Sequence, residues 1–200
     1  MKHYFTNDPD LKSAAWTIEY NYQNHRLTFL SDYGVFSKSR IDYGTHLLLQ
    51  AFTPPSKSSV RILDIGCGYG IIGLAIAKAY PDFQVELTDI NMRAVNLTQH
   101  NASVLNLNNV NIYIGNLYEN ADGLFDVIIT NPPIRAGKAT VYRIFNQGYN
   151  RLFPGGYLWA VVRKQQGAKS LIKKMAELFG IMEIVVVSKG YYVFYVKKAL

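Results

Sequence analysis

The stretch RILDIGCGYG, residues 61–70, decides the fold that this sequence predicts. It opens with an apolar run that has the length of a buried strand, and it leads into residues that favour a helix. Between the two lie three glycines at every second position, Gly66, Gly68 and Gly70. Such glycines let the backbone turn sharply and approach a ligand closely, and the helix N-terminus behind them favours negative groups. The stretch therefore predicts a strand, a ligand-binding turn and a helix.

The rest of the chain continues this alternation of strands and helices. Strands are expected at 60–65, 84–88, 111–114, 125–130 and 156–162, and helices at 70–79, 91–105, 138–152 and 167–179. Two last strands, 183–188 and 191–197, are joined by the tight turn Lys189-Gly190. This order predicts the α/β class, with a mainly parallel sheet, right-handed crossovers and one antiparallel strand from the final hairpin.

The N-terminal part of the chain is expected to form an extension of this core. Alternating apolar residues predict a hairpin over 16–22 and 27–29, and residues 44–52 favour a helix. The breaker-rich loop TPPSKSS, 53–59, follows. We expect residues 1–56 to pack as a hairpin and a helix on a core of residues 57–200, in one domain overall.

The composition is that of a globular protein, with 49% hydrophobic and 18% charged residues. Its single cysteine, Cys67, excludes an internal disulfide and favours a reducing cytoplasm. Four scattered histidines and one cysteine give no metal-ligand spacing, so no metal is expected. No apolar run approaches the ~20 residues of a membrane helix, and the N-terminus lacks an apolar signal core.

The positive charge is concentrated in one part of the chain. The net charge is +7, and residues 127–176 contain nine Lys or Arg and neither Asp nor Glu. A surface that faces a polyanion is the preferred interpretation of such a block, because Lys and Arg gain free energy by displacing counterions from phosphates. A solvated basic face is the alternative.

Two acids close to the glycines indicate the kind of ligand. Asp64 precedes the first glycine, where a carboxylate would repel a pyrophosphate but could hold a cationic amino group. Asp89 ends the next predicted strand, where its two oxygens could accept hydrogen bonds from both hydroxyls of a ribose. S-adenosylmethionine has this chemistry. Gly68, Gly70 and Gly73 also satisfy G-x-G-x-x-G, so an NAD-dependent oxidoreductase stays open.

The strand at 125–130 stops at Asn-Pro-Pro, Asn131 to Pro133. This end lies at the carboxyl edge of the sheet, where ligands bind in open α/β folds. Two prolines fix φ and remove N–H donors, which leaves carbonyl groups unpaired. The amide oxygen of Asn131 and the carbonyl of Pro132 could then accept two hydrogens of an exocyclic amine and stabilise the charge that develops on its nitrogen.

These stretches together resemble a known family. LDIGCGYG (63–70), TDIN (88–91) and NPPI (131–134) are similar to those of class I S-adenosylmethionine-dependent methyltransferases. With GVFSKSRIDYGTHLLL (34–49), the chain from about Thr28 onward resembles the catalytic half of the small-subunit ribosomal RNA guanine-N2 methyltransferase C family and its single-domain relatives. The resemblance implies a Rossmann-like sheet of seven strands with the last strand inserted antiparallel.

The resemblance also implies roles for individual residues. The loop of Gly66, Gly68 and Gly70, with Asp64 and Cys67, holds the methionine part of S-adenosylmethionine, and Asp89 holds the ribose. Ile90 packs on the adenine, and Asn116 and Leu117 lie at its edge, where an amide can both donate and accept hydrogen bonds. Asn131, Pro132, Pro133 and Ile134 form the catalytic stretch, and Asn131 also contacts the cofactor.

The fourth residue of that stretch differs from the resembled pattern, because Ile134 stands where an aromatic residue usually stacks on the base. An aliphatic side chain forfeits stacking worth about 1–3 kcal/mol. Phe36 could supply a ring instead, or serve as ordinary core. Arg135 and Lys138 follow at once and are expected to hold phosphates beside an extruded base.

The sequence therefore predicts an N-methyltransferase that acts on an exocyclic amine of a nucleobase, with guanine N2 in 16S ribosomal RNA first. Adenine N6 and a protein glutamine amide are alternative acceptors. An NAD-dependent oxidoreductase and a non-catalytic RNA-binding module are alternatives of other classes. The expected partners are ribosomal RNA or the small ribosomal subunit, with no membrane.

Overall fold

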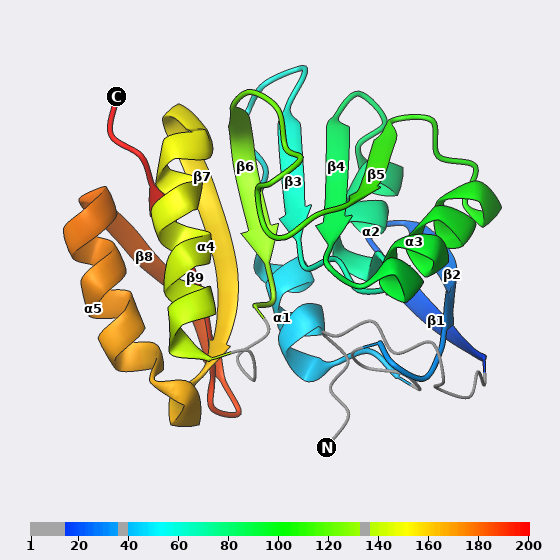
Figure 1. Ribbon diagram of the computed structural model, residues 1–200, viewed down its shortest axis with the longest axis horizontal. Coiled ribbons are helices and arrows are strands. Elements are labelled where there is room, and N and C mark those ends of the chain that lie inside the picture. Colours follow the sequence, from blue (N-terminus) through cyan, green and yellow to red (C-terminus); the bar gives the residue numbers. More distant parts are fainter. Residues whose placement is uncertain (1–14, 36–39, 133–136) are drawn as a thin grey trace.

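The computed structural model describes residues 15–35, 40–132 and 137–200 (Figure 1). The strands are β1 (Trp16–Tyr22), β2 (His25–Ser31), β3 (Arg61–Ile65), β4 (Gln84–Asp89), β5 (Val110–Ile114), β6 (Phe125–Thr130), β7 (Leu152–Arg163), β8 (Ile181–Ser188) and β9 (Tyr191–Lys197). The α-helices are α1 (Tyr43–Ala51), α2 (Ile71–Ala79), α3 (Met92–Val104), α4 (Lys138–Arg151) and α5 (Ala168–Phe179). Strands and helices alternate along the core, as the sequence predicted.

The described strands from β3 onward form one seven-stranded sheet in the order β5-β4-β3-β6-β7-β9-β8. Pairs from β5 to β7 are parallel, and β9 is antiparallel to both of its neighbours. The order reverses between β3 and β6, the place where open α/β sheets bind ligands. The expected Rossmann-like fold with a C-terminal antiparallel hairpin is confirmed.

Helices cover both faces of this sheet, as Figure 1 shows. Helices α1, α2 and α3 share one apolar cluster, centred on buried side chains such as Leu48, Leu74 and Val127. Helices α4 and α5 share a second cluster on the other face, which includes Phe145 and Phe194. β6 is buried at every position, because helices cover both of its faces. The sheet is therefore a rigid support for the residues at its carboxyl edge.

The N-terminal hairpin packs on the first of these clusters. β1 and β2 pair antiparallel through a two-residue turn in which Gln23 has a φ of 51°. Asn101 of α3 ties the hairpin down, because its side chain accepts from the Leu30 N–H at 2.7 Å and donates to the Leu30 carbonyl at 2.9 Å. The predicted division into 1–56 and 57–200 within one domain stays a prediction.

Four of the described strands begin earlier than the sequence predicted: β5 by one residue, β2 and β8 by two, and β7 by four. β2 starts at His25 rather than Leu27, since Tyr22 and His25 already pair across the turn. β7 starts at Leu152 rather than Gly156, although it contains Pro154 and two glycines. Leu152 pairs with Phe125 before the register shifts at a bulge, and bulges tolerate proline and glycine. Within the described residues, the helices are all too short or too polar to span a membrane.

Candidate active site

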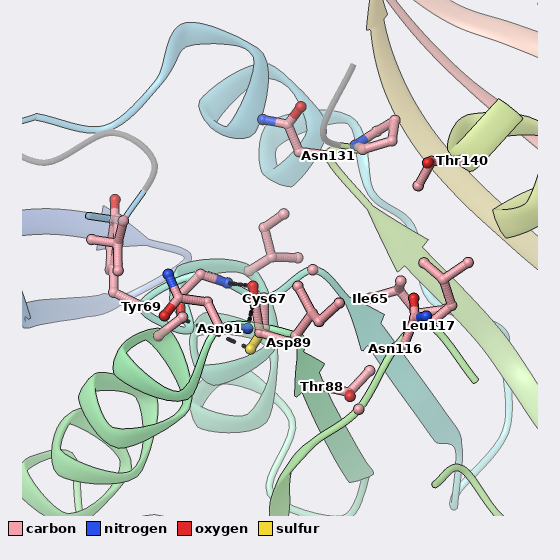
Figure 2. Close-up of a pocket in the computed structure, with 18 of the residues that line it drawn as sticks. Ile65, Cys67, Tyr69, Thr88, Asp89, Asn91, Asn116, Leu117, Asn131 and Thr140 are labelled. Atoms are coloured by element: carbon pink, nitrogen blue, oxygen red, sulfur yellow. Dashed lines mark hydrogen bonds between the residues drawn. The ribbon is translucent and has the colours of Figure 1, made fainter. Parts of the chain in front are cut away.

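A cavity of about 340 Å³ opens at the carboxyl edge of the sheet, above the point where the strand order reverses. The ends of β3, β4 and β6 contribute to it, together with α1 and α4. Figure 2 shows Asp89, Thr88 and Asn116 on one side of this cavity and Asn131 on the other. The cavity therefore brings together residues from the glycine loop, the acidic strand end and the Asn-Pro stretch.

The glycine loop is held by backbone hydrogen bonds to the neighbouring strand. The N–H groups of Gly66 and Cys67 donate to the Thr88 carbonyl at 2.9 and 3.1 Å. Gly66 and Gly68 have φ values of 71° and 60°, the left-handed region, and both line the cavity. Gly70 does not line it: a Cβ there would lie 2.7 Å from Thr98, so its place is a close contact between helices.

Asp64 lies beneath this loop and is fully buried, outside the lining of the cavity. Its Oδ2 accepts a hydrogen bond from the Gly73 N–H at 2.9 Å. Within the described part of the chain, its Oδ1 has no hydrogen-bond partner. Burial raises the pKa of Asp64 to about 7, against the lowering effect of the Gly73 N–H, and the charge of Asp89 adds to the rise. The predicted contact of this carboxylate with an ammonium group stays a prediction.

Asp89 lines the cavity and braces the glycine loop. Its Oδ2 accepts from the Gly68 N–H at 3.0 Å, and its Oδ1 accepts from the Asn91 N–H at 2.9 Å. Burial raises the pKa of Asp89, and these N–H groups partly offset the rise. Each carboxylate oxygen can accept a further hydrogen bond, so the strand end can still receive hydroxyl donors.

Apolar side chains lie beside Asp89 at the edge of the cavity. Ile90 lines the cavity and remains 46% exposed, so part of its apolar side chain is open to a ligand. Asn116 and Leu117 line the same side, and Leu117 holds a φ of 60° that turns the chain around the cavity. The Oγ1 of Thr88, which also lines the cavity, is buried without a hydrogen-bond partner among the described residues.

Asn131 follows β6 on the opposite side of the cavity. Its Nδ2 donates to Thr45 Oγ1 at 2.9 Å and to Asp42 Oδ2 at 3.3 Å, both from the start of α1. Asp42 is the N-cap of α1 and also accepts from the Gly44 and Thr45 N–H groups. Since a carboxylate can only accept hydrogen bonds, it fixes which end of the Asn131 amide faces α1. These contacts hold the Asn131 amide with its nitrogen toward the start of α1.

The cavity lining contains most of the predicted site residues. They are Gly66, Cys67, Gly68, Asp89, Ile90, Asn116, Leu117, Asn131 and Pro132. Lys138 does not line it and is the first residue of α4, beside a small hollow with Gly167 and Ser170. The predictions for Phe36, Pro133, Ile134 and Arg135 lie outside the described residues.

Some lining residues had no predicted role. Thr140 and Arg143 lie three apart on α4 and reach the cavity together, a spacing that the sequence shows once this helix is placed after the Asn-Pro stretch. Asp42 and Thr45 stood in the stretch IDYGT, where an acid three residues before a threonine signals only a helix start. No cluster of metal-ligating side chains occurs in the ranges that the structure covers.

Comparison with known proteins gives a family match over most of the chain. The model of the methyltransferase small domain matches residues 26–195. The uncharacterized protein YbxB of Bacillus subtilis is 43% identical over 98% of both chains. The ribosomal RNA small subunit methyltransferase C of Vibrio cholerae is 31% identical over 94% of this chain, which spans 55% of that protein.

The fold comparison agrees. A T. thermophilus 16S rRNA N2 methyltransferase (RsmC), solved in complex with AdoMet and guanosine, superposes with a TM-score of 0.81 at 25% identity. The match covers 95% of this chain and 52% of the RsmC chain. Taken with the cavity described above, these matches show that the chain belongs to the methyltransferase small domain family, class I enzymes whose cofactor is S-adenosylmethionine.

Proposed function

We propose that this protein transfers a methyl group from S-adenosylmethionine to an exocyclic amine of a nucleobase, first of all guanine N2 in 16S ribosomal RNA. The observation that carries the proposal is the fixed orientation of Asn131, whose amide hydrogens are held by Thr45 and Asp42. An amide oxygen at the cavity edge can accept a hydrogen bond from the amino group that receives the methyl group. It makes no hydrogen bond to a methyl acceptor that has no donor group.

The residues on the β3–β4 side suit the cofactor. Asp89 offers carboxylate oxygens for ribose hydroxyls, and Ile90 offers exposed apolar surface for adenine. At Gly68 a Cβ would meet nothing within 4 Å, so the loop faces open space that the methionine part can fill. When bound, the sulfonium supplies an activated methyl group, so no strong base is required before transfer.

The residues on the β6 side hold the acceptor. We propose that the Asn131 Oδ1 and the Pro132 carbonyl each accept one of the two hydrogens of the amine. These two hydrogen bonds direct the nitrogen lone pair into the cavity. Both groups are dipoles whose negative ends face a nitrogen that becomes positive as the new C–N bond forms. The excess proton then passes to water. Asn131 and Pro132 thus orient the nucleophile and stabilise its developing charge.

Two observations support RNA as the acceptor. The basic block at 127–176 includes Arg143 of α4, which lines the cavity and is exposed. Guanine N2 is supported by the RsmC relatives, one of which is named as an N2 methyltransferase and was solved with guanosine. With ribosomal RNA as substrate the protein would work in the cytoplasm, and Arg135, Lys138 and Phe36 remain proposed substrate contacts.

The test measures tritium transfer from labelled S-adenosylmethionine into total RNA, 30S particles, DNA and protein. Asn131→Ala is the matched variant: we expect label in RNA, identified as N2-methylguanosine, and a loss of at least about 100-fold in the variant. Calorimetry should show that Asn131→Ala still binds S-adenosylmethionine, since most of the cofactor contacts are assigned to the β3–β4 side.

Other outcomes would change the proposal in defined ways. Label in DNA adenine or in protein glutamine would keep the mechanism and replace the acceptor. Full activity of Asn131→Ala would remove Asn131 from the mechanism. Binding of NADH in place of S-adenosylmethionine, or RNA binding without methyl transfer in every fraction, would overturn the proposed activity.

A further inference from the structure

Two cations near the cavity are held over a pair of tyrosine rings. The Arg163 guanidinium, at the end of β7, lies 4.8 Å from the centre of the Tyr191 ring. The Lys189 ammonium, in the β8–β9 turn, lies 4.7 Å from the centre of the Tyr43 ring. The two rings meet edge to face at 5.7 Å, so the four side chains form one cluster, here called the tyrosine-pair cluster.

Hydrogen bonds fix the position of this cluster. The Tyr43 and Ser188 hydroxyls are 2.8 Å apart, which joins α1 to β8. The Tyr191 hydroxyl donates to Asp42 Oδ1 at 3.5 Å. Burial, and then the charge of Asp42, raises the pKa of Tyr191, so this phenol remains a donor. Cations that rest on fixed rings lose less side-chain entropy on binding an anion than free lysines do.

The cluster is directly connected to the acceptor side of the cavity. Asp42 accepts from Tyr191 with Oδ1 and from Asn131 with Oδ2. Tyr43 and Asp42 are neighbours in sequence, at the first turn of α1. Tyr191 of the cluster is therefore two hydrogen bonds from Asn131, the residue that we assign to the target amine, and the Asp42 carboxylate accepts from both residues.

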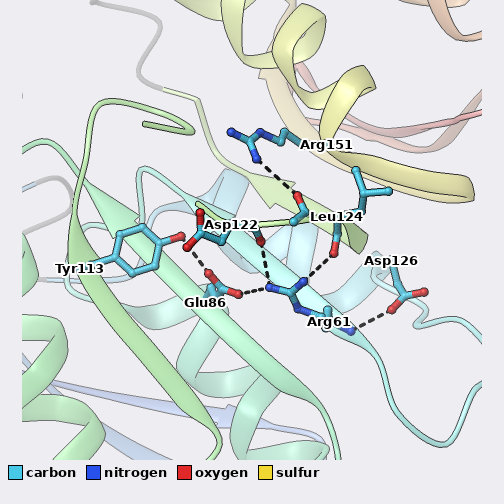
Figure 3. A network of polar contacts seen from close by, with 8 residues as sticks. Arg61, Glu86, Tyr113, Asp122, Leu124, Asp126 and Arg151 are labelled. Atoms are coloured by element: carbon cyan, nitrogen blue, oxygen red, sulfur yellow. Dashed lines mark hydrogen bonds and ion pairs between the residues drawn. The ribbon is translucent and has the colours of Figure 1, made fainter. Parts of the chain in front are cut away.

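The charges of Arg163 and Lys189 are exposed and lack an acidic partner within ion-pair distance in the described residues. Two cations at the opposite edge of the sheet, Arg61 and Lys57, differ in this respect. Figure 3 shows Arg61 engaged by Glu86 at 2.6 Å and by the Asp122 and Leu124 carbonyls. Lys57 is likewise paired with Asp126 at 2.6 Å. The positive charge is thus left available on the side of the cavity.

We propose that Arg163 and Lys189 form a phosphate-binding site for the RNA strand that carries the target base, at a nucleotide adjacent to it. The inference rests on the proposed RNA substrate. Both cations can donate to phosphate oxygens from the sides that do not face the rings, and a strand anchored there presents its neighbouring base to the cavity. The site reads no sequence, so it contributes affinity and position rather than base specificity.

The test compares two double variants with the same loss of charge. Arg163→Gln/Lys189→Gln removes the proposed site. Lys197→Gln/Lys198→Gln is the matched control, because these lysines also rest on tyrosine rings, at 5.1 and 5.0 Å, but at the opposite end of the sheet. Anisotropy with a fluorescein-labelled single-stranded RNA of mixed sequence measures affinity over a series of salt concentrations.

For the site variant we expect roughly tenfold weaker RNA binding, and a slope of log affinity against log salt that is smaller by about 1.4, or 0.7 for each lost contact. The control should keep a slope close to that of the unmodified protein. S-adenosylmethionine affinity should be equal in all three proteins, and Arg163→Lys/Lys189→Arg should restore RNA binding.

Equal RNA affinities and slopes for the two double variants would overturn this inference while leaving the methyl transfer unaffected. Failure of the proposed function is seen separately, as absence of label from RNA with the unmodified protein. If that protein does not bind the RNA probe at any salt concentration, the inference fails, while the RNA acceptor is judged by the label alone.

Discussion

At the scale of single residues, the orientation of Asn131 depends on groups outside the Asn-Pro stretch. Thr45 is buried, and its hydroxyl is the shorter of the two contacts to the amide. Without that acceptor, the amide nitrogen keeps only the 3.3 Å contact to Asp42, and the side chain can tilt from the position that accepts the amine.

Thr45→Val removes this hydroxyl and keeps the shape of the side chain. We expect kcat to fall about tenfold, the equivalent of one hydrogen bond of 1–1.5 kcal/mol, with unchanged cofactor affinity. Thr45→Ser retains the hydroxyl and should keep most of the activity. Steady-state methyl transfer and calorimetry measure the two quantities; equal losses in both variants would show that only packing matters at residue 45.

The raised pKa of Asp64 predicts that the free energy of unfolding depends on pH. Its folded-state pKa of about 7 lies above the ordinary 3.8, so between these values the folded chain keeps a proton that the unfolded chain has lost. The free energy of unfolding therefore falls as pH rises through this window, and above pH 7 the deficit stays constant.

Asp64→Asn abolishes this titration and retains an oxygen for the Gly73 N–H. From pH 5 to pH 8, we expect the wild type to lose roughly 2 kcal/mol of unfolding free energy relative to the variant. Urea unfolding without cofactor, at both pH values, measures the free energy of unfolding of the wild type and of the variant. Parallel pH profiles of the two proteins would mean that Asp64 is ionised in the folded state throughout.

At the scale of elements, α2 lies unusually close to the sheet. A Cβ on Gly73 would be 2.5 Å from Leu87 Cδ2 on β4 and 3.1 Å from Asp64 Oδ2. Gly73→Ala should therefore destabilise the fold by about 1–3 kcal/mol through overpacking. Leu87→Ala creates a cavity at the same place, so the double variant should be less destabilised than the sum of the single changes. If the losses of unfolding free energy from the two single changes simply add in the double variant, residues 73 and 87 do not interact in this way.

Sequence patterns predicted the elements well, because each depends on local periodicity. The alternation of strands and helices placed β3 to β9, and the carboxyl ends of parallel strands necessarily meet at one edge. The Asn131 contact to Asp42 joins residues 89 apart, and nothing local to either one specifies it. The start of β7 was missed for a related reason: its proline and glycine are read locally as breakers, whereas a bulge against β6 accommodates them.

At the scale of the whole molecule, the proposed function divides the sheet between two tasks. The residues assigned to the cofactor follow β3, β4 and β5, on one side of the reversal in strand order. Those assigned to the acceptor follow β6 or belong to α1, α4 and the β8–β9 turn. The cavity spans the line between β3 and β6, where Thr130 donates to the Ile65 carbonyl at 2.8 Å and keeps the two sides in register.

This division separates two kinds of evolutionary change. Under the proposed function, substitutions around α4 would alter which acceptor is held, and substitutions in the β8–β9 turn would alter how tightly its strand is bound, while the cofactor half keeps its chemistry unchanged. The turn consists of Lys189 and Gly190 at the tip of a hairpin, so it can lengthen or exchange residues without disturbing the buried strands. A lineage built on this scaffold can therefore change its substrate gradually while it remains a methyltransferase at every step.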